Sequence, residues 1–495
     1  MKRVQVVTMG CSKNRVDSEH LLRVLQQRGC TLVPETADLA DGGVDEVIIN
    51  TCGFIQDAKE ESIAAILEAA EAKKAGLIEK LSVFGCLSQR YPQELRAEIP
   101  EVDQWEGVLT FDTLGRVLTT PSHYAYLKIA EGCDRSCAYC AIPLIRGPHV
   151  SVPIEDLVEE ARGLAAQGVR ELIVIAQDTT YYGLDRYGKR CLARLLEQLA
   201  KIDGIQWIRL HYSYPTGFPE DVLRIMADNP KICPYIDIPL QHSADRVLSM
   251  MRRGIDGRQT RELVAKMRQL VPGVVLRTTL IVGHPGEGEA EFRDLLDFVR
   301  ESRFERLGAF TYSEEEGTYG ALHYKDEIPA QVKQERYDRL MELQSGISLA
   351  YNRSRIGTRE RVLVDSLAPA DPSSPAPTGS SSPAPTGSSS PAPAGSSSPA
   401  LTDPSSPALT GDLVLVARSR TESPEVDGEI LVDPRGWQDE RRPGGEVTVL
   451  SGQAPSLARN GSDFAQDNPA SLVGQFIDVE ITGADEYDLI ADIPR

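Results

Sequence analysis

The sequence lacks the features of membrane-embedded and secreted proteins. It has no run of eighteen apolar residues, so no segment is long enough to cross a bilayer as a helix. Its first residues, MKRVQVVTMGCSKN, reach polar residues too soon for a signal peptide. Apolar residues make up 41% and charged residues 25% of the 495 positions, which is ordinary for a globular protein of about three domains. We therefore expect a cytoplasmic protein with no membrane partner.

Positive charge is scarce as well. Lys and Arg total 53 against 73 Asp and Glu, which gives a formal net charge of −20. A surface of this sign repels the phosphate backbone of nucleic acids and favours basic partners. The nine cysteines do not indicate a disulfide framework, because such frameworks belong to small secreted domains. Metal or redox chemistry is the better expectation for them.

Strand and helix signals divide the α/β chain into three parts. Residues 1–120 alternate buried-strand and helix patterns, which predicts an N-terminal open parallel α/β domain. Residues 121–352 repeat six strand signals separated by helices and predict a partial, TIM-like (β/α) barrel. Residues 353–495 carry short strand signals such as RVLVD, LVLVA and EVTVL and predict a small β-barrel.

A Pro/Ser/Ala-rich insert interrupts the terminal part at residues 368–411. Its prolines recur every eight residues in units such as SSPAPTGS, and such a composition buries no core. We expect a disordered surface loop. A hidden repeat domain is the alternative, which the near absence of large apolar residues disfavours.

Three cysteines each follow a predicted strand of the N-terminal domain. Cys11 comes after VQVVTMG, Cys52 after VDEVIINT and Cys86 after KLSVFG. The carboxyl ends of parallel strands meet at one edge of a sheet, where ligand sites form. We therefore expect these three thiols to lie within reach of one another.

A second group of three cysteines, Cys133, Cys137 and Cys140, lies in EGCDRSCAYCAIP, directly after the first barrel strand. A helix would place them on one face as core packing, but Gly132 and Pro143 argue against a regular helix. Structural zinc sites usually combine pairs of ligands to reach four. Three thiolates suit a cubane iron-sulfur cluster that leaves one iron open to an exogenous ligand. Structural zinc and plain packing are the alternatives.

The C-x3-C-x2-C spacing, with Tyr139 before the last cysteine, resembles the signature of the radical S-adenosylmethionine (SAM) superfamily. The stretches GCSKN, NTCGF and FGCLSQR are similar to the N-terminal domain of its methylthiotransferase family. The resemblance implies two 4Fe-4S clusters, SAM as cofactor and an OB-like terminal barrel of the TRAM type. It assigns an auxiliary cluster to Cys11, Cys52 and Cys86, and the radical-generating cluster to Cys133, Cys137 and Cys140. Cys30, Cys191 and Cys233 match neither set, and we expect buried structural thiols there.

Within that family, SYPTGFPEDVL, PYIDIPLQHSADRVLSMMRRG and SRTESPEVDGEILVD resemble the RimO branch, which modifies an aspartate of ribosomal protein S12. The alternative is a tRNA adenosine methylthiotransferase of the MiaB type. From Gly411 to Arg495 there are 17 acidic against 7 basic residues. A barrel of this charge is expected to repel tRNA and attract basic S12. An acidic surface kept only for solubility explains the same count.

The resemblance also implies the chemistry. One SAM supplies a methyl group to sulfur, and a second supplies a 5′-deoxyadenosyl radical that removes hydrogen from the β-carbon of the aspartate. The product is 3-methylthioaspartate, and an external electron donor and a sulfur donor are required. No catalytic side chain is expected beyond the cluster ligands.

Further cofactor contacts are expected after the barrel strands, each with a structural alternative. Asp178 equally suits a loop cap, Gly283 and Gly286 suit a tight turn, and His242 and Arg253 either line the target channel or pack. The residues predicted to contact SAM are Tyr139, Gln177, Asp178, Arg277 and Gly283.

Overall fold

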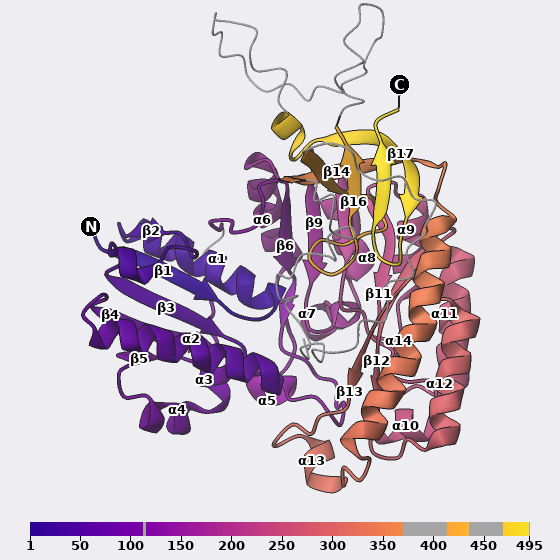
Figure 1. The fold of residues 1–495 in the computed structure, drawn as a ribbon, viewed down its shortest axis with the longest axis horizontal. Helices are drawn as coiled ribbons and strands as arrows, with labels where there is room; N and C mark the ends of the chain where they lie inside the picture. The colour runs from indigo at the N-terminus through magenta and orange to yellow at the C-terminus, as the bar shows by residue number, and fades with distance from the viewer. Residues whose placement is uncertain (112–114, 370–412, 435–468, 495) are drawn as a thin grey trace, which may run out of the picture.

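The protein folds into two parallel α/β units and a small terminal β-barrel (Figure 1). The structure, a computed structural model, describes residues 1–111, 115–369, 413–434 and 469–494. Among these residues, no helix combines the length and the apolar character needed to cross a bilayer. The expected α/β class with a terminal β-barrel is confirmed.

The N-terminal unit is an open, fully parallel sheet with flanking helices. Its elements are β1 (Arg3–Thr8), α1 (Ser12–Gln27), β2 (Thr31–Val33), η1 (Leu39–Asp41), β3 (Glu46–Thr51), α2 (Gln56–Lys74), β4 (Lys80–Gly85), α3 (Cys86–Arg90), α4 (Pro92–Glu98) and β5 (Gln104–Trp105). The strand order is β2-β1-β3-β4-β5. All six residues of the central strand β3 are buried, because a parallel sheet is covered on both faces.

The central unit is a six-stranded parallel sheet whose strands follow one another in chain order. Its elements are β6 (Tyr124–Lys128), β7 (Ala130–Glu131), α5 (Ile142–Arg146), β8 (Val150–Ser151), α6 (Ile154–Ala166), β9 (Glu171–Ile175), η2 (Thr179–Tyr181), α7 (Leu184–Tyr187), α8 (Leu192–Leu199), β10 (Trp207–Leu210), α9 (Glu220–Asp228), β11 (Ile232–Asp237), α10 (Asp245–Met250), α11 (Gly257–Leu270), β12 (Val275–Val282), α12 (Glu289–Ser302), β13 (Arg306–Thr311), α13 (Tyr319–His323) and α14 (Ala330–Arg353). The order β6-β9-β10-β11-β12-β13 is that of the predicted partial barrel.

Side chains alternate between the two faces of this sheet with the strand period of two. Ala125 and Leu127 of β6 join the core under the outer helices. Tyr124 and Tyr126 of the same strand face inward and pack on Val16 of α1. The N-terminal unit therefore covers the inner face near β6, and Figure 1 shows α1 beside that strand.

The terminal barrel is closed, in the strand order β14-β15-β16-β18-β17. Its elements are β14 (Arg359–Pro369), β15 (Leu413–Arg418), β16 (Ile430–Asp433), η3 (Pro469–Leu472), β17 (Phe476–Ala484) and β18 (Leu489–Asp492). The predicted start of the insert at 368 is wrong, because Ala368 and Pro369 extend β14 and pair with Val414 and Leu413. Pro369 is tolerated there because it ends the strand. The rest of the predicted insert and the predicted strand at residues 446–450 lie outside the described residues.

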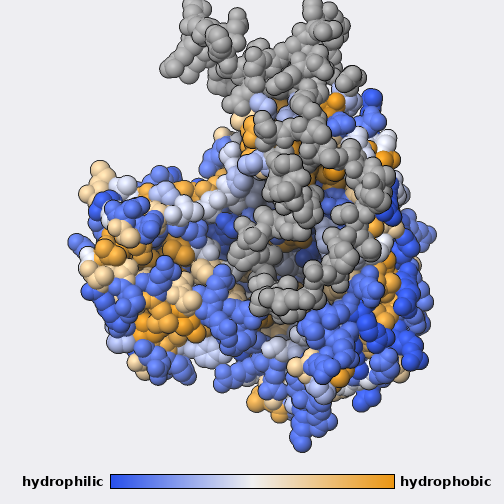
Figure 2. All heavy atoms as spheres, viewed as in Figure 1, coloured by the Kyte–Doolittle hydropathy of each residue, from blue (hydrophilic) through white to orange (hydrophobic). Residues whose placement is uncertain are grey.

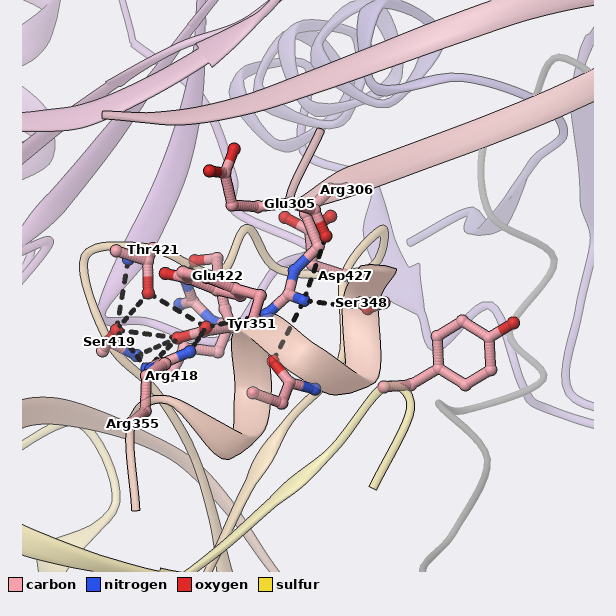
Figure 3. A network of polar contacts seen from close by, with 12 residues as sticks. Glu305, Arg306, Ser348, Tyr351, Arg355, Arg418, Ser419, Thr421, Glu422 and Asp427 are labelled. Atoms are coloured by element: carbon pink, nitrogen blue, oxygen red, sulfur yellow. Dashed lines mark hydrogen bonds and ion pairs between the residues drawn. The ribbon is translucent and has the colours of Figure 1, made fainter. Parts of the chain in front are cut away.

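The SRTES segment, which links β15 and β16, docks the barrel on the central unit through Glu422 (Figure 3). Glu422 Oε1 lies 3.1 Å from Arg306 Nη2 and also pairs with Arg355, while Ser419 Oγ donates to Oε2 at 2.7 Å. Burial alone would raise the pKa of Glu422, but the two guanidiniums hold it below the usual range. One buried carboxylate thus joins β13, the end of α14 and the barrel.

A second set of buried ion pairs continues this contact. Arg209 of β10 pairs with Glu171 Oε1 at 2.8 Å, and Arg418 of the barrel pairs with Glu171 Oε2 at 2.9 Å. Arg209 also donates to the backbone oxygens of Arg420 and Ser419. Paired charges of this kind hold a fixed geometry, because separating either partner leaves an uncompensated buried charge.

The acidic residues of the barrel mostly point inward or lie half-buried. Glu422 is buried, Glu425 accepts from the hydroxyls of Tyr124 and Tyr126, and Asp427 accepts from Tyr235. Of the acidic residues that the structure describes between 413 and 494, only Asp478 and Asp492 are fully exposed. The count of 17 acidic residues therefore overstates the negative charge that the described barrel presents to a partner.

Replacing Glu422 with glutamine is expected to destabilise the protein by about 3 kcal/mol, because Arg306 and Arg355 lose their shared carboxylate in a buried site. Thermal unfolding and limited proteolysis measure the effect. The control is Glu480→Gln, whose carboxylate lies 3.6 Å from the exposed Arg359 and should contribute less than about 1 kcal/mol. Equal unfolding temperatures for the two variants would contradict the docking role.

Candidate active site

The three N-terminal cysteines, Cys11, Cys52 and Cys86, meet at one edge of the first sheet. Gly10 has a φ of +84°, and a Cβ placed on it would lie 2.9 Å from Cys52 Sγ. Glycine therefore lets the Cys11 loop approach Cys52. Burial raises the pKa of the Cys52 thiol, and the neighbouring Cys11 and Cys86 raise it further. The prediction that these strand ends converge is confirmed.

The loop cysteines, Cys133, Cys137 and Cys140, lie on irregular backbone between β7 and α5. No helix runs through them, so the helical packing alternative is wrong. Pro143 sits instead in the first turn of α5, where a missing N–H costs no intrahelical bond. Burial raises the pKa of the Cys133 thiol to about 11 and also raises that of Cys140. A cationic metal centre would favour the thiolate form of Cys133 and Cys140 at neutral pH.

Polar donors point at the sulfurs of the loop cysteines. Arg253 Nη1 lies 3.3 Å from Cys137 Sγ, and the backbone N–H of Arg135 donates to Cys133 Sγ at 3.4 Å. The Tyr214 hydroxyl lies 3.5 Å from Cys137 Sγ. The guanidinium of Arg135 lies over the Tyr214 ring at 4.1 Å, and that of Arg253 lies over it at 4.2 Å. Hydrogen bonds to sulfur ligands are among the factors that set the potential of an iron-sulfur cluster.

A single guanidinium joins Cys86 of the N-terminal group to Glu131, which lies two residues before the first loop cysteine. Arg146, the last residue of α5, donates from Nε to Cys86 Sγ at 3.2 Å and from Nη2 to Asn14 Oδ1 at 2.5 Å. Its Nη1 lies 3.0 Å from Asp17 Oδ2 and 2.8 Å from Glu131 Oε2. The sequence analysis missed this residue; the only local signal is an arginine six positions after Cys140.

Glu131 connects the same network to the next barrel strand. Its carboxylate accepts from Lys128 Nζ at 2.9 Å, and Gln177 Nε2 donates to it at 2.6 Å. Burial alone would raise the pKa of Glu131, but Lys128 and Arg146 lower it to about 2. Lys128 also pairs with Asp17 of α1. One ionic network therefore connects Cys86 and α1 to the segment that leads into the loop cysteines.

The structure places three of the predicted SAM contacts in the surroundings of the loop cysteines. Tyr139 accepts a hydrogen bond from Arg253 Nη1 at 3.2 Å, and Gln177 binds Glu131. Asp178 caps η2 by accepting from Thr180 N at 2.9 Å, and it pairs with Arg135 Nε at 2.7 Å. The capping alternative for Asp178 is thus observed, while its contact with SAM stays a prediction.

The remaining predicted residues make structural contacts, and the contacts of Arg277 and Gly283 with SAM stay predictions. Arg277 pairs with Asp237 at 2.9 Å and lies 3.7 Å from Asp427 of the barrel. Gly283 has a φ of +75°, and a Cβ there would lie 2.4 Å from Lys333 Cγ, as the tight-turn alternative requires. His242 is fully buried; its Nδ1 accepts from two backbone N–H groups, so Nε2 carries the proton toward Glu287. His242 therefore packs rather than lining a channel.

The cysteines outside the two groups fit the prediction in part. Cys191 and Cys233 are buried, as expected. Cys30 is only half-buried, so the expectation for it is wrong. Cys30 directly precedes β2, which is an edge strand and has a neighbouring strand on one side only.

The two cysteine groups offer donors of the kind that an anionic cluster would need. Among the described residues, no three His, Cys, Asp or Glu side chains lie close enough to hold one metal ion. A tetrahedral zinc with Zn–S bonds of about 2.3 Å needs its sulfurs within roughly 4 Å of each other. A cubane distributes its thiolates over separate irons and so spaces them more widely. The donor set, with N–H groups aimed at Cys86, Cys133 and Cys137, fits an anionic cluster.

Comparison with known proteins identifies the family. The Radical SAM superfamily model matches residues 127–299, and the model described as Uncharacterized protein family UPF0004 matches residues 3–107. The ribosomal protein uS12 methylthiotransferase RimO of Bacteroides thetaiotaomicron is 43% identical over 99% of this chain and 98% of its own length. The chain belongs to the RimO family. The RimO of Porphyromonas gingivalis strain ATCC 33277 is 53% identical over 73% of this chain and 86% of its own length.

Membership of the RimO family confirms the resemblance read from the cysteine motifs. As a member of the radical SAM superfamily, the chain uses SAM and a 4Fe-4S cluster. Among solved structures, the radical SAM methyltransferase TsrM from Kitasatospora setae aligns with a TM-score of 0.48 at 14% identity, over 63% of this chain and 75% of its own.

Proposed function

We propose that this chain transfers a methylthio group to the β-carbon of an aspartate of ribosomal protein S12. The name of the RimO relatives supports the substrate, and their similarity extends over nearly the whole chain. The observation that carries the proposal is the contact of Arg146 with both Cys86 of the N-terminal group and Glu131, two residues before the loop cysteines. Radical formation and sulfur delivery need two centres held side by side, and this contact links the segments that carry them.

We assign the loop cysteines to the cluster whose open iron binds SAM, and the N-terminal cysteines to an auxiliary cluster. When bound, the two clusters and SAM supply the radical and the methylthio group. The chain itself contributes positioning: Arg253 and the Arg135 N–H donate to the first group, and Arg146 donates to the second. A fourth thiolate at either cluster would close the position that the reaction needs.

The residues predicted to contact SAM fall into two groups, those beside the loop cysteines and those with other contacts. Tyr139 and Gln177 are retained as residues that line the SAM site, because Arg253 and Glu131 orient them beside the loop cysteines. Asp178 is assigned a positioning role through Arg135. Arg277 and Gly283 are assigned to barrel docking and to a tight turn.

The remaining assignments concern the domains, the electron and sulfur donors, the location of the protein and tRNA. Residues 1–120 form the auxiliary-cluster domain, 121–352 the radical SAM domain and 353–495 the TRAM domain. An external electron donor and a sulfur donor complete the reaction, and a ribosomal protein as substrate places it in the cytoplasm. Transfer RNA is not expected to bind, because the chain carries a net charge of −20.

Deletion of the gene tests the proposal in cells. Intact-mass analysis of S12 from the deletion strain is expected to show loss of one methylthio group, and the wild-type gene should restore it. A Cys137→Ala gene is the matched control and should not restore it. Unchanged S12 together with a lost tRNA modification would contradict the proposal.

A further inference from the structure

Helix α13 lies directly on the loop that carries Cys133, Cys137 and Cys140. Gly320 N donates to Ala138 O at 2.6 Å, and Ala138 is the residue after Cys137. A Cβ placed on Gly317, in the loop before α13, would lie 3.4 Å from Leu144 Cδ1 of α5. Figure 1 shows α5 and α13 near one another at the lower edge of the molecule. A polypeptide bound on α13 would therefore lie next to the proposed radical cluster.

Three large apolar side chains stand exposed on these two helices. Leu144 of α5 is 60% exposed, and Leu322 and Tyr319 of α13 are 71% and 40% exposed. The Tyr319 ring is held in place by His323, stacked at 3.9 Å, and by Arg252 at 4.3 Å. We call Leu144, Tyr319 and Leu322 the mouth patch. In Figure 2, hydrophobic side chains stand among hydrophilic ones at the lower end of this face, where α13 lies in Figure 1.

Acidic residues flank the mouth patch on both sides along the chain. Glu314 and Glu316 are exposed in the loop before α13, and Asp326 and Glu327 are exposed after it. Asp326 pairs with Lys333. The other three carboxylates still outnumber the exposed cations of the same region, Arg252 and Lys325. An apolar centre with an acidic rim fits a basic polypeptide that presents an apolar side chain, and it disfavours a nucleic acid.

We propose that the mouth patch docks the segment of S12 that carries the target aspartate. The inference rests on the proposed function, and it moves the partner surface from the terminal barrel to the mouth of the central unit. The barrel turns Glu422, Glu425 and Asp427 toward its own docking contacts, whereas Glu314 and Glu316 are open to solvent. Leu144 lies against the loop that leads into α13. Exposed apolar groups rimmed by charge mark interaction sites more often than isolated apolar residues do.

The test replaces Leu322 with asparagine, which removes the apolar contact without adding charge. The matched control is Leu67→Asn, which changes a 48% exposed leucine of α2. Binding of purified S12 to the reconstituted holoenzyme, measured by fluorescence anisotropy, is expected to weaken about tenfold for the first variant and to stay unchanged for the second. The KM for S12 should rise with the dissociation constant, while kcat, iron content and SAM cleavage without S12 stay at wild-type values.

A second variant tests the acidic rim. Glu314→Gln is expected to weaken S12 binding at low salt, with the difference fading as the ionic strength rises. Equal S12 affinity for Leu322→Asn and Leu67→Asn, with wild-type enzyme still modifying S12, would overturn the docking surface and leave the proposed function standing. Wild-type enzyme that cleaves SAM but leaves S12 unmodified would overturn the proposed function itself.

Discussion

Replacing Cys52 with alanine is expected to abolish methylthiolation and to remove about half of the iron, while SAM cleavage continues. Cys52 belongs to the N-terminal group, whose proposed cluster delivers sulfur, and the loop cysteines are untouched. Replacing Cys137 should abolish SAM cleavage, because its sulfur, which accepts a hydrogen bond from Arg253, belongs to the group proposed to bind SAM. That variant should keep about four of roughly eight irons and cleave no SAM. Anaerobic iron and sulfide analysis, with chromatography of 5′-deoxyadenosine, separates the two patterns.

Cys30→Ala is the matched control for both variants, because this half-buried thiol belongs to neither group. It should retain all iron and full activity. Bound zinc without sulfide would contradict the cluster assignment. So would a Cys52→Ala protein that loses SAM cleavage while Cys137→Ala keeps it, since this would exchange the two proposed roles.

Replacing Arg146 with glutamine is expected to lower methylthiolation about 10–100-fold, the usual cost of removing a residue that orients a metal ligand. The change removes the N–H donated to Cys86 Sγ and leaves Asp17 and Glu131 with Lys128 as their remaining shared cation. Arg146→Lys should not rescue it, because a lysine presents one point charge where the guanidinium reaches four partners.

The redox potential distinguishes this role from a merely structural one. Losing a hydrogen bond to Cys86 is expected to shift the potential of the auxiliary cluster to more negative values in an electron paramagnetic resonance titration. Arg90→Gln is the matched control, because Arg90 pairs with Glu315 at 3.0 Å across the same two units without contacting a cysteine sulfur. An unshifted potential for Arg146→Gln, or the same shift for Arg90→Gln, would contradict the role given to Arg146.

Local patterns in the sequence predicted the strand ends that carry the cysteines. Cys11, Cys52 and Cys86 each follow an apolar run, so parallel-sheet geometry alone indicated that they meet. The irregular loop of Cys133 was also predictable, because Gly132 precedes it and Pro143 follows it, and both residues disfavour a regular helix.

Contacts between distant segments were beyond such reasoning. Arg146 binds side chains from residues 14, 17, 86 and 131, and no spacing along the chain reveals that set. The SRTES segment was read as a family signature, yet Glu422 docks the barrel through arginines at 306 and 355. The count of acidic residues in the barrel overstated the negative charge on its surface, because composition cannot tell an inward carboxylate from an exposed one.

Contacts formed only in the folded chain also surround residues that follow the barrel strands. Lys333 lies beside Gly283 and leaves no room for a Cβ there, while the contact of Gly283 with SAM stays a prediction. His242 likewise binds Glu287, a residue 45 positions away on the chain. Sequence reasoning placed both residues after the correct strands and could not decide which neighbour each would meet.

The central claim is that two cysteine groups act together on one aspartate of S12. Its most direct test incubates reconstituted holoenzyme anaerobically with purified S12, SAM, sulfide and a reductant, followed by intact-mass and fragment-mass analysis of S12. The account predicts that one methylthio group replaces one hydrogen of a single aspartate, and that neither Cys52→Ala nor Cys137→Ala enzyme makes this product. Transfer of the group to tRNA instead of S12, or modification of S12 by either variant, would contradict it.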